Sequence, residues 1–173
     1  GRSHEFDNVG EALSISMIQL QRYIEAIDTV MEDAIAKTVE SPQPARVLAN
    51  YAETREGEQH IGKVWKQLDD GAVVFFKAFG YPSGMLRTAN VRQAGRYRIS
   101  VTGYAHQSEQ PITFAIGATT FQRGSERPTF AYRALPPGPA TTVQIEAWID
   151  SNYMIEITPW GISDSDNEIR RNG

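Results

Sequence analysis

The fold of this chain is decided by the stretch Ala94-Gly95-Arg96-Tyr97-Arg98-Ile99-Ser100-Val101-Thr102-Gly103-Tyr104-Ala105. Apolar side chains at 97, 99 and 101 alternate with polar ones at 96, 98, 100 and 102. This period of two is typical of a strand with one buried face, and a turn glycine begins it. Because further alternating runs follow, residues 62–162 are predicted to form a mainly β domain, an antiparallel β-sandwich of the jelly-roll kind.

The other predicted strands are short and separated by turn signals. They span 64–68, 72–78, 112–116, 129–135, 142–150 and 153–159. Asp69-Asp70-Gly71 predicts a hairpin between the first two, because an Asp-Gly pair supports positive φ. The run Val73-Val74-Phe75-Phe76 is apolar on both faces, which favours a central strand. No strand–helix alternation indicates a parallel α/β sheet.

A long amphipathic helix is predicted before the sandwich. Ser16 and Gln19 have the spacing of a capping box, and the pair Ser41-Pro42 ends the helix. Residues recur at alternating spacings of three and four along one stripe: Met17, Leu20, Ile24, Ile27, Met31, Ala34 and Thr38. The stripe is expected to pack on a neighbouring helix or on the sandwich, and a homodimer through a coiled coil is the alternative.

Four segments follow from these patterns. Residues 1–44 are expected to hold the N-terminal segment and the long helix, which ends an upstream helical domain. Residues 45–61 are interpreted as a linker with one short helical stretch at 45–52 and a polar loop at 53–59. The sandwich occupies 62–162, and a polar tail occupies 163–173. The chain is interpreted as a piece of a longer protein.

Composition excludes several classes of function. The 173 residues carry 17 basic and 21 acidic side chains, a net charge of -4, which argues against a nucleic-acid partner. The count of zero cysteines excludes disulfides, iron–sulfur clusters and thiol nucleophiles within this segment. No apolar run approaches the ~20 residues that a membrane span needs.

Catalytic motifs are absent from the sequence, so the chain is predicted not to be an enzyme. The three histidines, His4, His60 and His106, lie outside any nucleophile or metalloprotease pattern. Paired carboxylates perform glycosidic hydrolysis, and the last two predicted strands offer three candidates: Glu146, Asp150 and Glu156. The favoured interpretation is that they are solvent-facing residues, and a hydrolase or lyase is the minority alternative.

Metal and cofactor sites are likewise not predicted. Asp164, Asp166 and Glu168 form an oxygen-rich run of the kind that Ca²⁺ binds, but the EF-hand pattern is not met. Asp69 and Asp70 are better explained as turn formers.

Aromatic residues on polar strand faces are the strongest candidates for a binding site. Trp148 and Tyr104 are out of phase with the buried residues of their strands, and Trp160 is a third candidate. Aromatic rings stack on sugars while polar neighbours hold the hydroxyl groups, here Gln144, Arg98 and Glu146. We therefore expect a non-catalytic module that binds a glycan. The alternative for these aromatic residues is that both sheet faces are buried, one inside the sandwich and one against the N-terminal helix. The alternative function is a structural module that docks neighbouring domains, or mediates oligomerisation, through the helical stripe and the sheet face.

Two segments carry a family resemblance. The segment from His4 to Ser16, followed by Gln19-Leu20-Gln21-Arg22-Tyr23-Ile24-Glu25-Ala26, resembles large planctomycete-type proteins that combine domains of unknown function with a c-type cytochrome domain. The strand Gly95–Ile99 is similar to the sandwich that follows in that family. The resemblance implies an exported, periplasmic or extracellular parent protein with this piece as a module like carbohydrate-binding modules. It implies no haem here, because the haem-attaching cysteines of the family are absent.

Overall fold

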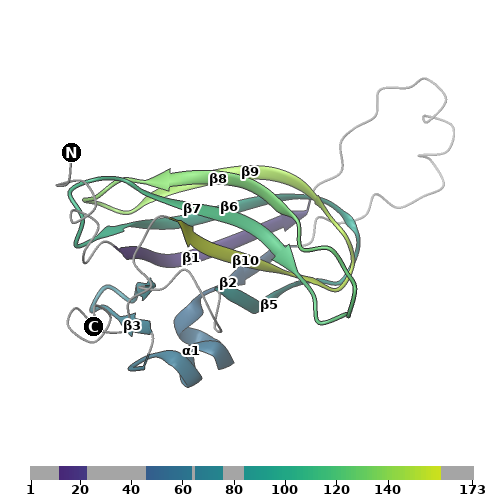
Figure 1. Ribbon diagram of the computed structural model, residues 1–173, viewed down its shortest axis with the longest axis horizontal. Helices are drawn as coiled ribbons and strands as arrows, with labels where there is room; N and C mark the ends of the chain where they lie inside the picture. Colours follow the sequence, from purple (N-terminus) through teal and green to yellow (C-terminus); the bar gives the residue numbers. More distant parts are fainter. Residues whose placement is uncertain (1–11, 23–45, 64, 76–83, 161–173) are drawn as a thin grey trace, which may run out of the picture.

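The computed structural model describes residues 12–22, 46–63, 65–75 and 84–160, which form two antiparallel sheets (Figure 1). The six-stranded sheet contains β1 (Ala12–Arg22), β2 (Arg46–Ala49), β3 (Trp65–Gln67), β4 (Val73–Phe75), β6 (Gly95–His106) and β9 (Thr141–Ile149). The four-stranded sheet contains β5 (Met85–Val91), β7 (Ile112–Thr119), β8 (Thr129–Leu135) and β10 (Tyr153–Trp160). The protein is therefore mainly β, and its sheets include a curled half-barrel.

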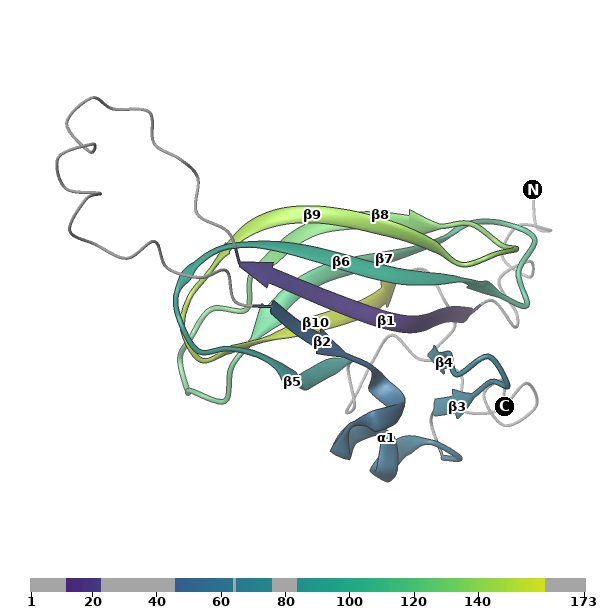
Figure 2. The same cartoon turned by 180° about the vertical axis from the view of Figure 1, so that it is seen from behind.

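The strand order places β6 between β1 and β9. The larger sheet runs β3-β4-β1-β6-β9, with β2 also paired to β1, and the smaller sheet runs β5-β10-β7-β8. Figures 1 and 2 show β1, β6 and β9 side by side along the molecule, with α1 and the short strand β3 below them. The face of β6 and β9 that points away from the core is thus a continuous surface.

Both sheets contribute to one apolar core, and alternation decides which residues enter it. On β6, Tyr97, Ile99 and Val101 are buried, as their period of two predicts. Phe114 from β7 and Ile157 from β10 belong to the same buried cluster. The predicted strands at 64–68, 72–78, 112–116, 129–135, 142–150 and 153–159 correspond to β3, β4, β7, β8, β9 and β10.

The predicted N-terminal helix is wrong over residues 12–22, which form the strand β1. The ladder between β1 and β6 shifts register between Ile15 and Met17, so a bulge separates two alternating runs. Leu13 and Ile15 enter the core before the bulge, and Ile18 and Leu20 enter it afterwards. Of the two residues that the predicted helical stripe has in this segment, Leu20 is buried but Met17 is exposed. The rest of the predicted helix lies outside the described residues.

The segment predicted as a linker is also structured where it is described. Residues 46–49 form β2 rather than a helical turn, and a 3₁₀ turn at Tyr51–Glu53 leads into the helix α1 (Arg55–His60). Thr54 begins that helix, because its hydroxyl accepts the Gly57 N–H at 3.1 Å. Glu56 is 2% exposed, and its carboxylate lies 2.9 Å from the Nε of Arg87 on β5. This ion pair fixes a charged helix against the sheets.

The predicted hairpin at Asp69-Asp70-Gly71 is confirmed. The carboxylate of Asp70 accepts the Ala72 N–H at 2.9 Å, and Gly71 has a φ of +86°. The hairpin joins β3 to β4, and all three residues of β4 are buried. β4 lies between β3 and β1, which confirms that it is an internal strand.

None of the helices among the described residues has the length and apolar character that crossing a membrane would need.

Candidate functional site

The candidate site is the outer face of β6 and β9. Antiparallel pairing sets Arg96 opposite Trp148, Arg98 opposite Glu146, Ser100 opposite Gln144 and Thr102 opposite Thr142. These residues alternate with the buried ones of the two strands, so they form two facing rows directed away from the core. The sheet register thus gathers four of the six predicted site residues: Arg98, Gln144, Glu146 and Trp148.

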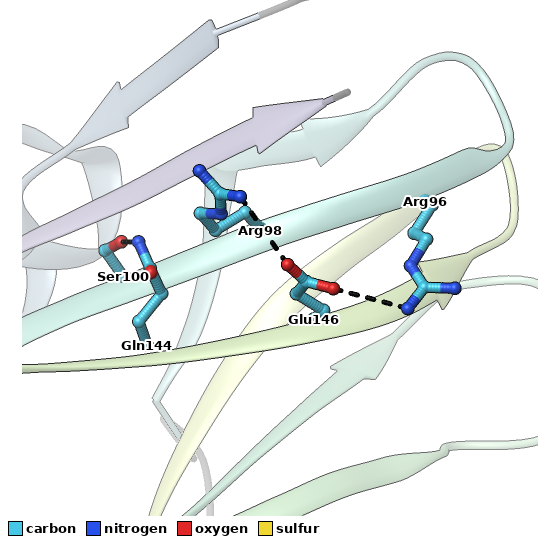
Figure 3. A network of polar contacts seen from close by, with 5 residues as sticks. All are labelled: Arg96, Arg98, Ser100, Gln144 and Glu146. Carbon is cyan, nitrogen blue, oxygen red and sulfur yellow. Dashed lines mark hydrogen bonds and ion pairs between the residues drawn. The ribbon is translucent and has the colours of Figure 1, made fainter. Parts of the chain in front are cut away.

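Polar contacts join the two rows (Figure 3). The Glu146 carboxylate lies between two guanidinium groups, with Oε2 at 3.2 Å from Arg96 Nη2 and Oε1 at 3.5 Å from Arg98 Nη2. Gln144 donates from Nε2 to Ser100 Oγ at 2.9 Å. The side chains are thereby arranged before any ligand arrives, but they stay accessible, because Arg96 and Glu146 are 44% and 39% exposed.

Trp148 supplies an apolar surface at one end of this polar face. Its side chain is 64% exposed, an unusual state for the largest apolar residue. The indole Nε1 donates to Asp150 Oδ1 at 3.2 Å, which restrains the ring without covering it. A restrained and exposed ring is suited to stacking, because little conformational entropy is lost when a ligand binds.

Tyr104 lies at the other end of β6, eight positions from Arg96, or about 26 Å along a strand. Its hydroxyl donates to Asp70 Oδ2 at 2.6 Å and so reaches the β3–β4 turn. Burial and this hydrogen bond raise the pKa of Tyr104, and the same bond lowers the pKa of Asp70. Because of this separation Tyr104 and Trp148 do not form one platform.

Trp160 lies on β10 in the other sheet, with 62% of its side chain exposed. Its ring meets that of Tyr132 edge to face, with centroids 5.8 Å apart and planes at 74°. The same sheet carries a hollow of about 210 Å³ lined in part by Arg127 and Glu156, which lie 3.6 Å apart as an ion pair. The structure therefore does not bring Trp160 together with the residues of β6 and β9.

Among the described residues, the carboxylates and histidines singled out in the sequence lie on different elements. Glu146 and Glu156 belong to different sheets, and Asp150 contacts Trp148. Burial lowers the pKa of His60 and of His106, which lie on α1 and β6. In the part of the chain that the structure describes, no three acidic, histidine or cysteine side chains gather as metal ligands would. His4 and the acidic run at 164–168 lie outside the described residues.

The sequence interpretation missed three contributors to this face. Arg96, Ser100 and Asp150 were not assigned to it, although the first two share the outward parity of Arg98. Their parity was available from the sequence, but the pairing of β6 with β9 was not.

A second missed feature is a groove of about 470 Å³ at the edge between the sheets, lined in part by Val47 on β2 and Asn90 on β5.

Comparison with known proteins assigns only the N-terminal part of the chain. Residues 1–36 match the family model PSD3, described as a protein of unknown function (DUF1587). No curated protein and no solved structure gave a significant match. The match agrees with the predicted presence of a domain of unknown function at the N-terminal end, and the β part of the chain is unassigned.

Proposed function

We propose that this chain is a non-catalytic binding module whose ligand is a glycan, bound on the outer face of β6 and β9. The observation that carries the proposal is the exposed, restrained ring of Trp148 at the end of two facing polar rows. Stacking on an aromatic ring and hydrogen bonding to hydroxyl groups are the two contacts that sugar recognition needs. The module is proposed to belong to an exported parent protein.

The strand order supports the further proposal of a jelly-roll sandwich like those of carbohydrate-binding modules. Without β2 and β3, the two sheets contain four strands each, β4-β1-β6-β9 and β5-β10-β7-β8. Eight antiparallel strands in two such sheets are the composition of a jelly roll. Fold alone does not establish function, so the residues of the β6–β9 face are the main support for glycan binding.

The proposal predicts a large loss of affinity in Trp148→Ala. Stacking that covers ~80 Å² of apolar indole surface contributes about 2 kcal/mol at ~25 cal/mol per Å², which corresponds to roughly 30-fold in the dissociation constant. Affinity gel electrophoresis over a panel of soluble polysaccharides measures this change. The matched control is Trp160→Ala, because that tryptophan is equally exposed, at 62%, but lies on the other sheet.

Two results would refute the proposal. One is a wild-type protein that no polysaccharide in the panel retards. The other is an equal loss of affinity in the two tryptophan variants, since this would separate binding from the face of β6 and β9.

A structural module that docks neighbouring domains or a second copy is the alternative function. The observation that favours it is the exposed pair Tyr132–Trp160, because adjacent exposed aromatic rings are typical of protein interfaces. Under this alternative, sedimentation velocity would show self-association that Trp160→Ala removes, together with no retardation by polysaccharides.

A further inference from the structure

We infer that the β6–β9 face binds an internal stretch of a long, linear and uncharged polysaccharide, which lies along the strands from Trp148 to Thr142. The inference rests on the proposed function and adds the shape and the charge of the ligand. Three properties of the face carry it: its length, its openness and its balance of charge.

The face is long and narrow. The outward residues of β9 are Thr142, Gln144, Glu146 and Trp148, and all four are exposed. Successive ones are about 7 Å apart, so the row extends about 20 Å along the strand. Antiparallel pairing sets a residue of β6 opposite each of them. A single sugar ring on Trp148 would leave most of this row uncovered, whereas a chain of several rings would cover it.

Uncharged hydrogen-bonding groups continue the row beyond the tryptophan. Gln144 donates from Nε2 to Ser100 Oγ at 2.9 Å, and the hydroxyl oxygens of Thr102 and Thr142 are 2.8 Å apart. These bonds use only part of the capacity of Gln144 and Thr142, because an amide has two N–H donors and an acceptor, and a hydroxyl donates and accepts. Sugar hydroxyls also donate and accept. The row therefore offers matching contacts about 13 Å and 20 Å from Trp148 along the strand.

The rows lie on an open surface. The two hollows described above, of about 470 Å³ and 210 Å³, are lined by other residues of the described structure. A site for a single small molecule is concave and covers most of its ligand. An open face instead contacts one side of an extended ligand, so the interior units of a polymer bind as well as its ends.

The charges between the two ends of the face balance. Arg96 and Arg98 are the cations of the β6 row, and the anions are Glu146 on β9 and Asp150 just after it. Glu146 lies 3.2 Å from Arg96 and 3.5 Å from Arg98 (Figure 3), and Asp150 accepts the indole N–H of Trp148 at 3.2 Å. Two cations and two anions give no net attraction for a carboxylated or sulfated polymer. An uncharged chain is therefore the better match.

The test measures the affinity of the 173-residue chain for oligosaccharides of increasing length by isothermal titration calorimetry. The probes are the dimer, tetramer and hexamer of the cello-, manno-, xylo- and laminari-oligosaccharide series, which are all linear and uncharged. In at least one series we expect the affinity to rise about tenfold or more from dimer to hexamer, because each added unit makes further contacts. Reduction of the terminal sugar of the hexamer to its alditol should leave the affinity almost unchanged, because interior units bind. Transfer from about 0.1 M to 1 M NaCl should also have little effect.

Variants at the two ends of the row locate the ligand. Trp148→Ala should weaken the binding of every oligosaccharide in the series. Thr142→Val keeps the shape of the side chain and removes its hydroxyl, so it should weaken the hexamer about fivefold. The dimer should be unaffected by Thr142→Val, because a dimer on Trp148 does not extend about 20 Å along the strand. Thr129→Val is the matched control, because it makes the same change at an exposed position on β8 in the other sheet.

The outcomes separate this inference from the proposed function. Equal affinity for dimer and hexamer, with binding still lost in Trp148→Ala, would overturn the extended ligand and keep the glycan module. Retardation by branched or charged polysaccharides alone, with none of the four series bound, would have the same meaning. Binding to no polysaccharide or oligosaccharide would overturn both. Equal weakening of the hexamer by Thr142→Val and Thr129→Val, or a tenfold loss of affinity at high salt, would also overturn the inference.

Discussion

The strand assignment of residues 12–22 leads to a sharp prediction about two adjacent side chains. Ile18 is 1% exposed in the core, whereas Met17 is 44% exposed on the outer face. A helix built on the stripe Met17, Leu20, Ile24 would reverse these roles. Substitution of each by alanine therefore distinguishes a strand from a helix at this position.

The expected magnitudes differ severalfold. Ile18→Ala removes buried methyl groups and leaves a cavity, so it should lower the free energy of unfolding by about 2–5 kcal/mol. Met17→Ala should cost at most about 1 kcal/mol, because its side chain stays in contact with water. With an m-value of about 2 kcal/mol/M, the first change shifts the urea midpoint by ~1–2.5 M, which is easily measured.

Urea unfolding followed by circular dichroism is the appropriate assay. Leu20→Ala serves as the positive control, because Leu20 is buried in the strand and was also part of the helical stripe. A larger loss of stability in Met17→Ala than in Ile18→Ala would refute the strand β1. That result would restore a helix for this segment and remove β1 from the sheet.

Two further predictions test the turns of the β region. Gly84→Ala should lower the free energy of unfolding by about 2–4 kcal/mol, and Gly124→Ala by about 1 kcal/mol. The two glycines have similar φ values, +78° and +75°, but only at Gly84 would an added Cβ meet the backbone of β10, at 1.8 Å from the Ile157 oxygen. Equal losses in urea unfolding would contradict the close approach of the chain there. The hydrogen bond from the Tyr104 hydroxyl lowers the pKa of Asp70 in the folded protein. The bond therefore stabilises the fold fully above about pH 4, the pKa of Asp70 in the unfolded chain, and this stabilisation is lost as the pH falls through the pKa of Asp70 in the folded protein. Tyr104→Phe should therefore raise the Asp70 pKa in an NMR titration, and an unchanged value would show that the bond has no such effect.

Much of the β architecture was predictable because alternation reflects local chemistry. β6, β7, β8, β9 and β10 all occur where alternating runs predicted strands. β1, β2 and β5 were missed; β2 has only four residues, and β1 and β5 have irregular pairing. The β1–β6 ladder shifts between Ile15 and Met17, and the β5–β10 ladder shifts between Met154 and Ile155. At such an irregularity the buried positions of a strand change from odd to even residue numbers, or the reverse, so the alternation of apolar and polar residues is interrupted.

The sequence by itself determined which side chains of each regular strand face outward, since parity needs no knowledge of neighbouring strands. Arg98, Glu146 and Trp148 were identified as polar-face residues in this way. Only the tertiary structure decided which of them meet. Pairing of β6 with β9 joins residues about 50 positions apart, whereas Trp160 falls on the other sheet. The physical reason is that side-chain direction is set by the local backbone, but strand partners are chosen by burial of the whole core.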